Sequence, residues 1–298
     1  MQSIPDLALP LDPLSPRLAL DEPFTTAAAA AAGIGRTVLD RLHRQGRVRR
    51  LLRGVYADAT VPDSLHLRAR AVGLVVTKGH VVTGRTAAWL HGIDAWREDL
   101  DAPVPVDVRG RGRGNRERLA GHDVEEVDGL MRTTALRTAL DLGRALGPDR
   151  ALAVLDAALA LRAFPHVALM AELARFGGRP GVGQLRELAA LADSRADGPA
   201  ESVLRRRWHH GRLPTPTPGL VVAGLAVTRP LRLALGLEAQ RFGAVIGGQV
   251  SEADRLTVVR SGWRVLSLAT ARVVHGEPEM LTAHLEREFH LHLLDQVG

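Results

Sequence analysis

An alanine, a glycine and a leucine at positions 29, 33 and 39 restrict the fold of the N-terminal part of this chain more than any other feature. A small residue four positions before a glycine lets two helices approach closely, and glycine tolerates the left-handed conformation of a helix end. We therefore expect a helix over 27–32, capped by a threonine hydroxyl at 25 or 26, and a reversal of the chain at Gly33. This spacing is typical of a helix-turn-helix.

A second helix is expected to follow this turn and to stop at Gly46. Its apolar side chains predict a buried stripe formed by Val38, Leu39 and Leu42. Its outward face is basic, and guanidinium groups suit both phosphates and guanine edges. The residues predicted to contact bases or phosphates from this face are Arg36, Thr37, Arg41 and Arg44.

Two short alternating runs over 47–51 and 54–56, with a turn at Leu52-Arg53, predict a β-hairpin after the second helix. A hairpin beside a recognition helix can grip neighbouring phosphates or the minor groove. The hairpin residues expected to follow the DNA backbone are Arg47, Arg49, Arg50 and Arg53. The alternative is a solvated helical hairpin whose arginines are incidental.

Positive charge is concentrated in this short region. Residues 33–60 hold seven arginines against two aspartates, a balance of +5, whereas residues 1–32 carry a balance of −3. The absence of cysteine excludes disulfides and thiolate metal ligands. No signal peptide and no apolar run long enough to span a bilayer are recognisable. We therefore expect a cytoplasmic, globular protein.

An Arg-Gly repeat follows a predicted strand over 104–108 in the middle of the chain. Glycine lets a guanidinium enter a narrow minor groove, so Arg109, Arg111 and Arg113 are further candidate DNA contacts. The alternative is a solvated hairpin tip. His91 is expected to pack in the interior rather than to act as a catalyst.

Several motifs together resemble AbiEi-type antitoxins. Those that resemble the N-terminal winged helix of this group are Phe24-Thr25-Thr26-Ala27, Ala32-Gly33-Ile34, Gly46-Arg47-Val48 and Arg53-Gly54-Val55-Tyr56. Those that resemble the segments that follow it are Thr86-Ala87-Ala88-Trp89-Leu90-His91-Gly92 and Thr133-Thr134-Ala135-Leu136-Arg137-Thr138-Ala139-Leu140-Asp141-Leu142. The resemblance implies a bacterial protein that binds DNA and represses its own operon, beside a nucleotidyltransferase-type toxin.

The order of predicted elements after residue 200 resembles a very-short-patch-repair-like endonuclease of the PD-(D/E)XK fold. Expected are a helix over 201–208, strands over 220–227, 231–237, 241–246 and 263–268, and a long last helix with Leu281, Leu285, Phe289 and Leu293 on one face. The resemblance places Ala234, Val245 and Gly247 where that family has acidic metal ligands, although Glu201 is retained. Alanine, valine and glycine side chains offer no oxygen to a divalent metal, so the domain is expected to be degenerate.

Other residues of this last part are predicted to have structural roles. Ala234 and Val245 are expected to face a former active-site cleft. An exposed face is expected for the arginines Arg205, Arg206 and Arg207 and for the histidines His284, His290 and His292.

The fold class expected is therefore an α+β or α/β multidomain protein. It would comprise an extended lead-in over 1–21, a winged helix-turn-helix over 22–60, a mixed α/β middle domain over 61–195 and a restriction-endonuclease-like domain over 196–298.

The function expected is a non-catalytic DNA-binding transcriptional regulator without cofactor or metal. Double-stranded DNA is the expected partner, and a second copy of the chain and a cognate toxin remain open as further partners. An antitoxin and a metal-dependent DNA endonuclease are the alternatives.

Overall fold

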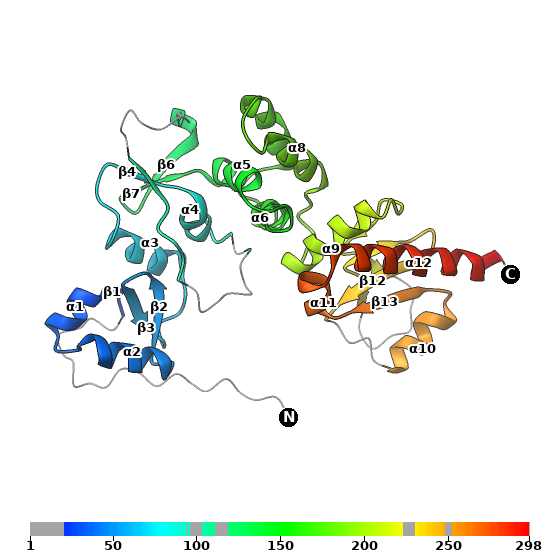
Figure 1. The fold of residues 1–298 in the computed structure, drawn as a ribbon, viewed down its shortest axis with the longest axis horizontal. Coiled ribbons are helices and arrows are strands. Elements are labelled where there is room, and N and C mark those ends of the chain that lie inside the picture. Colours follow the sequence, from blue (N-terminus) through cyan, green and yellow to red (C-terminus); the bar gives the residue numbers. More distant parts are fainter. Residues whose placement is uncertain are drawn as a thin grey trace. The chain divides into compact units, whose positions relative to one another are not determined.

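The computed structural model describes residues 21–93, 95, 103–110, 119–222, 230–247 and 252–297 of the 298-residue chain. The chain divides into two compact units, residues 1–142 and 143–298. Each unit combines helices with small sheets, so this is a mixed α/β protein of more than one domain (Figure 1). The finer division into four segments stays a prediction.

The first unit begins with two helices and a three-stranded antiparallel sheet of order β1-β3-β2. The elements are β1 (Phe24–Thr25), α1 (Thr26–Ala31), α2 (Arg36–Arg44), β2 (Val48–Leu52) and β3 (Val55–Asp58). Strand β1 precedes the helices in sequence but pairs with β3, which closes this part of the unit around its own small core.

The turn between α1 and α2 has the glycine geometry that the sequence predicts. The Thr25 hydroxyl accepts a hydrogen bond from the Ala28 N–H at 3.1 Å and so caps the start of α1. Gly33 has a φ of +88°, and the following Ile34 N–H donates to the Ala29 carbonyl at 2.9 Å. These bonds satisfy carbonyls at the end of α1 and fix the direction in which α2 leaves.

The core beneath these helices confirms most of the predicted pattern and corrects one position. Its members are Phe24, Ala29, Ile34, Leu39, Leu42, Val48 and Tyr56. Val38 is 36% exposed, so the prediction that it is buried is wrong. Leu39 and Leu42 set the inward direction of α2, and Val38 projects about 100° away from Leu39.

The hairpin is also shifted from its predicted position. Its turn is Arg53-Gly54, with a φ of +79° at Gly54, whereas Leu52 is fully buried in β2. A bulge between Arg50 and Leu52 accommodates Leu51, so that both leucines are buried.

The rest of the first unit is built around a four-stranded mixed sheet of order β5-β4-β7-β6. The elements are α3 (Leu65–Gly73), β4 (His80–Val82), α4 (Gly84–Leu90), β5 (Val108–Gly110), the 3-10 turn η2 (Gly121–Asp123), β6 (Val124–Val127), β7 (Leu130–Thr133) and α5 (Ala135–Ala145). The strand expected over 104–108 is displaced to β5, because Val104 makes only an isolated bridge to Leu52.

A buried arginine holds this sheet to α5. Arg137 Nη1 donates to Asp123 at 2.8 Å, and its Nε donates to Asp141 at 2.9 Å. His91 packs nearby as expected: its Nε2 lies 2.8 Å from the Thr133 carbonyl oxygen, and burial lowers the pKa of its ring. The segment 133–142 that the sequence singles out is therefore a packing motif in this structure.

The second unit opens with helices. They are α6 (Pro148–Ala160), α7 (His166–Glu172), the 3-10 turn η3 (Leu173–Phe176), α8 (Val182–Leu191) and α9 (Pro199–His210).

Ion pairs join α6 to α9 inside this unit. Arg205 and Asp156 are both buried and hydrogen-bonded, and Ser202 Oγ also donates to Asp156 at 2.5 Å. Burial raises the pKa of Asp156, and Arg205 opposes that rise. Arg207 binds both oxygens of Asp149, at 2.9 and 2.6 Å.

The prediction of an exposed arginine face at 205–207 is therefore wrong. Arg205 and Arg207 are buried, and Arg206 Nε donates to Asp149 at 2.6 Å. Asp149 and Asp156 lie far away in sequence, which is why the run 205–207 gave no sign of its partners.

The C-terminal sheet is four-stranded, of order β13-β12-β11-β8, and only β12 and β13 are parallel. Strands β9 and β10 form a separate, two-stranded antiparallel sheet. The elements are β8 (Thr217–Pro218), β9 (Val221–Val222), β10 (Leu231–Arg232), β11 (Leu235–Leu237), β12 (Phe242–Ile246), α10 (Glu252–Arg260), β13 (Arg264–Leu268), α11 (Thr270–His275) and α12 (Pro278–Val297). No helix of the described residues is long and apolar enough to cross a membrane.

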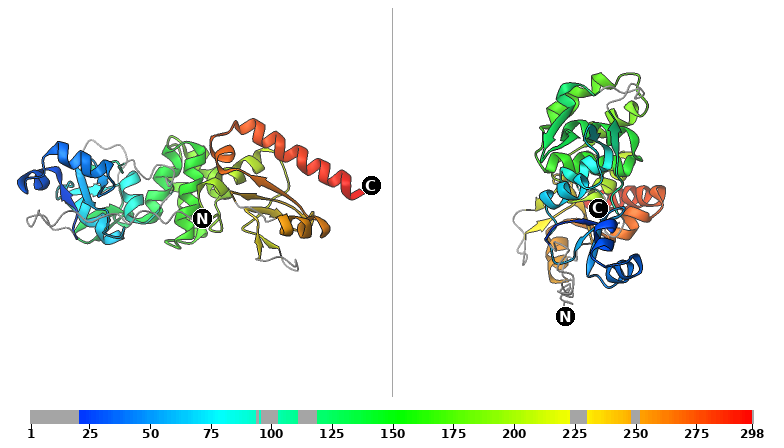
Figure 2. Two further views of the ribbon diagram at one scale, coloured as in Figure 1. Left: turned by 90° about the horizontal axis from the view of Figure 1, so that it is seen from below. Right: turned by 90° about the vertical axis from the view of Figure 1, so that its left-hand side faces the viewer.

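Apolar clusters cover both faces of this sheet. One joins α9, α11 and α12 to the sheet around Trp208 and Phe242, and the other packs α10 and Trp263 against Val245. Figure 2 shows α12 lying along the sheet. Leu281, Leu285 and Phe289 are buried there as predicted, and Leu293 packs against the cluster.

The prediction of an exposed histidine face on α12 fails at one position. His292 is buried, its Nε2 lies 2.7 Å from the Gln240 carbonyl oxygen, and its ring packs on Phe242.

We expect Arg205→Met to lower the free energy of unfolding of the full chain by about 3–5 kcal/mol, because Asp156 would keep a buried charge without its ion-pair partner. Arg186→Met on the exposed side of α8 is the matched control and should change this free energy by less than about 0.5 kcal/mol. Urea unfolding followed by circular dichroism measures both. Equal effects of the two substitutions would contradict the structural role of the pair.

Candidate nucleic-acid interface

The outward face of α2 carries the residues that the sequence predicts. Arg36, Thr37, Arg41 and Arg44 are all exposed. Thr37, Arg41 and Arg44 follow the i, i+4, i+7 spacing and therefore form one stripe along the helix. Among the described residues, no hydrogen bond or ion pair engages Arg36, Arg41 or Arg44, so these guanidinium groups are available to a ligand.

Helix α2 is held firmly against the hairpin. Gly46 turns the chain with a φ of +69°, and the Arg47 N–H donates to the Leu42 carbonyl at 2.9 Å. His43 Nδ1 lies 3.1 Å from the Val48 carbonyl oxygen, and its ring meets the edge of Tyr56. These contacts therefore hold the basic stripe on α2 in a fixed position relative to strand β2.

The four hairpin arginines differ in their surroundings. Arg53 is exposed at the turn, whereas Arg47, Arg49 and Arg50 are half-buried. Arg49 Nη2 donates to the Val61 carbonyl at 2.5 Å and lies close enough to Asp63 to contribute to the lowered pKa of that carboxyl, which Arg68 mainly causes. Arg49 therefore ties the hairpin to the segment that follows it.

The Arg-Gly repeat is only partly described. Arg109 lies on β5, is half-buried and pairs in register with Val81 of β4. Arg111 and Arg113 lie outside the described residues. The structure therefore brings Arg109 into a sheet and does not place it with the stripe on α2.

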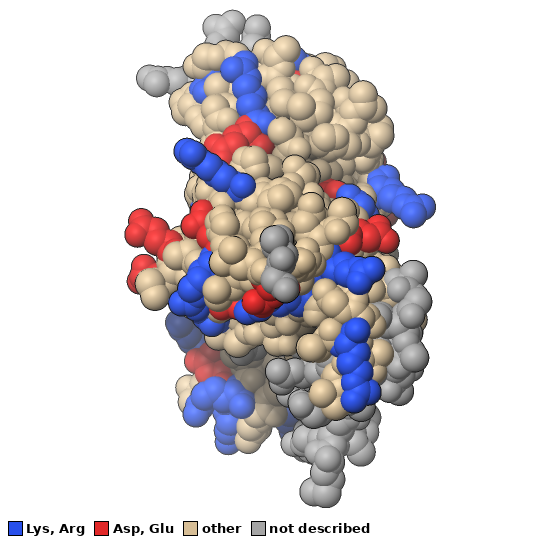
Figure 3. All heavy atoms as spheres, turned by 90° about the vertical axis from the view of Figure 1, so that its right-hand side faces the viewer, with Lys and Arg blue, Asp and Glu red and all other residues tan. Residues whose placement is uncertain are grey.

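The second unit offers a different charge pattern. On the face that Figure 3 shows, viewed from the side of α10 and α12, basic and acidic side chains are interspersed. The arginines of α9 are engaged by Asp149 and Asp156, as described above.

The positions compared with nuclease metal ligands do not meet in one cleft. Ala234 belongs to the cluster around Trp208, whereas Val245 belongs to the cluster around Trp263 on the opposite face of the sheet. Gly247 lies at the end of β12 with a φ of +58°. The expectation that Ala234 and Val245 face a common cleft is therefore wrong, because Ala234, in the bend between β10 and β11, and Val245, on β12, pack into separate clusters on opposite faces of the sheet.

The retained acid, Glu201, is engaged by an arginine. Arg232 Nη1 donates to its Oε1 at 2.5 Å and Nη2 to its Oε2 at 3.0 Å. The Asp197 N–H also donates to Oε2, at 2.8 Å. The hydrogen bonds with Glu201 raise the pKa of Arg232. A guanidinium therefore neutralises the carboxylate that a nuclease would direct towards a cation.

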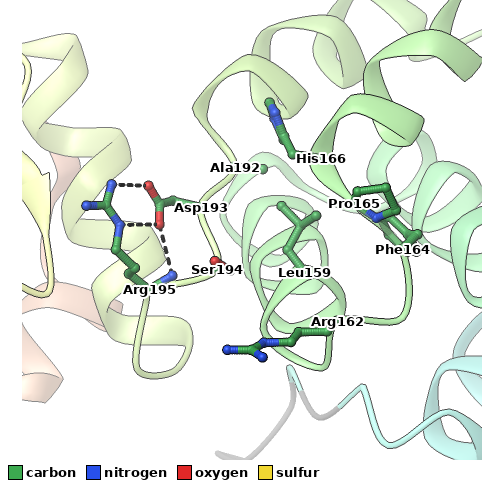
Figure 4. Close-up of a pocket in the computed structure, with 9 residues that line it drawn as sticks. All are labelled: Leu159, Arg162, Phe164, Pro165, His166, Ala192, Asp193, Ser194 and Arg195. Atoms are coloured by element: carbon green, nitrogen blue, oxygen red, sulfur yellow. Dashed lines mark hydrogen bonds and ion pairs between the residues drawn. The ribbon is translucent and has the colours of Figure 1, made fainter.

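A groove of about 740 Å³ lies between the end of α6, the start of α7 and the segment after α8 (Figure 4). Its polar groups are largely engaged: Arg195 binds both oxygens of Asp193, and His166 Nε2 lies 2.7 Å from the Ala189 carbonyl oxygen. Arg162 borders it with a φ of +53°. None of the residues predicted as site residues line this groove.

Sequence reasoning missed two features of these sites. Val38 lies exposed beside the basic stripe, and the inward spacing of Leu39 and Leu42 alone, without Val38, would have shown it. The ion pair of Glu201 with Arg232 had no sequence signal, because the two residues belong to elements that meet only in the folded unit.

Comparisons with known proteins find a family match over the part of the chain that contains α2 and most of the hairpin. Residues 16–57 match a family model described as "Transcriptional regulator, AbiEi antitoxin". Two proteins of Mycobacterium tuberculosis, the uncharacterized proteins MT2308 (strain CDC 1551 / Oshkosh) and Rv2248 (strain ATCC 25618 / H37Rv), are each 30% identical over 267 residues. The alignment covers 85% of this chain and 96% of each relative.

The chain belongs to the family of these mycobacterial proteins. It carries an AbiEi-type regulator domain at its N-terminus. No solved structure matches the chain.

We expect Arg49→Met to lower the free energy of unfolding by about 1–2 kcal/mol, because the Val61 carbonyl loses a charged donor. Arg53→Met, in the same hairpin but exposed, is the control and should leave this free energy unchanged within about 0.5 kcal/mol. Urea unfolding of the full chain measures the free energy of unfolding of both variants. A larger loss of stability in Arg53→Met than in Arg49→Met would contradict the structural role of Arg49.

Proposed function

We propose that this protein is a DNA-binding transcriptional regulator whose recognition helix is α2. The single observation that carries the proposal is the exposed stripe of Thr37, Arg41 and Arg44, whose arginines have no partner among the described residues. Elsewhere in the chain, many arginines are held by carboxylates, so the stripe is a distinct surface.

The topology around α2 supports a winged helix-turn-helix. A strand, two helices joined by a glycine turn, and a hairpin that returns to the first strand follow one another in the order β1, α1, α2, β2, β3. In this arrangement α2 would lie in the major groove, with Arg36, Arg41 and Arg44 directed at bases or phosphates. The exposed Arg53 at the hairpin turn would reach the adjacent backbone.

The role proposed for the last part of the chain is structural, as a catalytically inactive nuclease-like domain. A mixed sheet in which the last strand runs parallel to its neighbour, flanked by α9 and α10, supports the nuclease-like frame. Ala234, Val245 and Gly247 supply no carboxylate, and Glu201 is neutralised by Arg232. With these residues the domain would lack the ligands that hold a hard divalent metal.

An antitoxin function is the second candidate, and the description of the matching family model favours it. Both functions would use the same DNA-binding surface if the antitoxin acts through transcription. They differ in a protein partner: co-purification of a toxin encoded beside the gene, and rescue of cells from that toxin, would favour the antitoxin.

We expect the affinity of the full chain for DNA to fall steeply with salt, since each phosphate contact contributes a log–log slope of about −0.9. Arg41→Ala should weaken binding to a preferred site by about 1–3 kcal/mol and relax the sequence preference, because the stripe would lose a base or phosphate contact. Selection from a random DNA library followed by fluorescence anisotropy at several salt concentrations measures these effects.

The matched control for this experiment is Arg186→Ala on α8, an exposed arginine outside the proposed surface. It should bind DNA like the wild type. A salt slope near zero, or equal losses in the two variants, would place the DNA-binding surface elsewhere or remove it.

Incubation of the full chain with plasmid DNA and Mg²⁺ or Mn²⁺ is expected to leave the plasmid intact, because the metal-ligand positions hold no carboxylate apart from the engaged Glu201. Gel electrophoresis measures the outcome. Cleavage by the wild type that disappears in Glu201→Gln, while circular dichroism shows both proteins folded, would overturn the inactive assignment.

A further inference from the structure

Strand β13 forms one edge of the C-terminal sheet. Among the described residues it pairs only with β12, in parallel and without a register shift. The Arg264 N–H donates to the Arg241 carbonyl and the Gly247 N–H donates to the Leu268 carbonyl, both at 2.9 Å. Because main-chain groups alternate in direction along a strand, those of Val265 and Ser267 point to the outer edge.

This outer edge is open among the residues that the structure describes. A groove of about 690 Å³ runs along β13 between α10 and α12, and its lining includes the whole stretch from Trp263 to Ser267. Figure 1 shows the strand between these two helices. Ser267 is exposed, and Val259 at the α10 side of the groove is 68% exposed.

The opposite edge of the same sheet is protected in the usual way. Strand β8 has only two residues, Thr217 and Pro218, and proline offers no N–H to a further strand. Strand β13 has five residues and contains neither proline nor a bulge. Unprotected edges of this kind are templates for the addition of a further strand.

We propose that β13 pairs with β13 of a second copy of this chain in antiparallel orientation. With Leu266 of the two copies opposite each other on a twofold axis, Val265 of one copy lies opposite Ser267 of the other. These are the residues whose N–H and C=O groups point outward, so each would exchange both main-chain hydrogen bonds with its counterpart. The two sheets would then form one continuous sheet across the axis.

The charges around the groove favour a like copy over a strongly charged ligand. On α12, Glu288 and Asp295 accept from Arg264 at 2.7 and 3.2 Å, and Arg287 lies beside Glu288. A twofold axis brings such a mixed set against itself, so opposite charges can come within reach. The half-buried Leu266 and the exposed Val259, which both line the groove, supply apolar surface that the second copy would cover.

The test is the mass of the full chain in solution at micromolar concentration, by light scattering and sedimentation velocity without DNA. The wild type is expected to be a dimer. Ser267→Pro removes an outward N–H and no bond to β12, so it should weaken the dimer about tenfold or more while circular dichroism stays unchanged. Ser267→Thr keeps the N–H and is the matched control.

Ser267→Lys places a charge on the edge and should also give a monomer, which decides the matter if the proline variant does not fold. In the wild-type dimer, the Val265 and Ser267 amides should exchange with deuterium more slowly than in Ser267→Lys. A monomeric wild type, or dimers that persist in both the proline and the lysine variants, would overturn the proposal. Because no DNA is present, this result is independent of the proposed function.

Discussion

A guanidinium group that is removed from water must find a carboxylate, and much of this structure depends on how that requirement is met. Arg137 meets it with Asp123 and Asp141, Arg205 with Asp156, and Arg207 with Asp149. Except for Arg137–Asp141 within α5, these pairs join different elements, such as α6 and α9. Removing one partner leaves a buried charge, so these pairs fix which helices meet.

The same requirement separates structural arginines from those that a ligand can use. Nearly all basic residues of this chain are arginines, so residue type alone does not distinguish the two groups. Helix α2 does: its inward side is filled by Leu39 and Leu42, and no carboxylate among the described residues engages Arg36, Arg41 or Arg44. Arginines stay available to a ligand where the fold brings no carboxylate of the described residues next to them.

The parts of the fold that depend on local physics could be predicted from the sequence. A threonine cap at 25 or 26, the Gly33 turn and the core position of Leu39 follow from spacing and backbone preference. The structure has all three, with Thr25 as the cap. Long-range partners could not be predicted in this way. Nothing near Arg205 in sequence indicates Asp156, which lies on another helix, so two arginines of a run expected to be exposed, Arg205 and Arg207, are buried instead.

The outward face of α2 was predictable because it follows from the same periodicity as the core. The roles within the hairpin were not, because the bulge after Arg50 and the bond from Arg49 to Val61 arise only when the strands pair. Side chains alternate between the two faces of a strand, so one extra residue at a bulge moves the side chains that follow it to the opposite faces.

If the C-terminal sheet is the nuclease-like frame that we propose, its stability does not depend on a bound metal. Carboxylates gathered in one site repel each other unless a cation lies between them. Here one carboxylate remains, and the guanidinium of Arg232 supplies its counter-charge from within the chain. Ala234 and Val245 instead add apolar contacts on opposite faces of the sheet, so apolar packing stabilises the sheet on both sides. An acid placed at Ala234 would lie in the cluster around Trp208, where burial of its charge would cost folding free energy. The packing of this sheet therefore disfavours a carboxylate at that position.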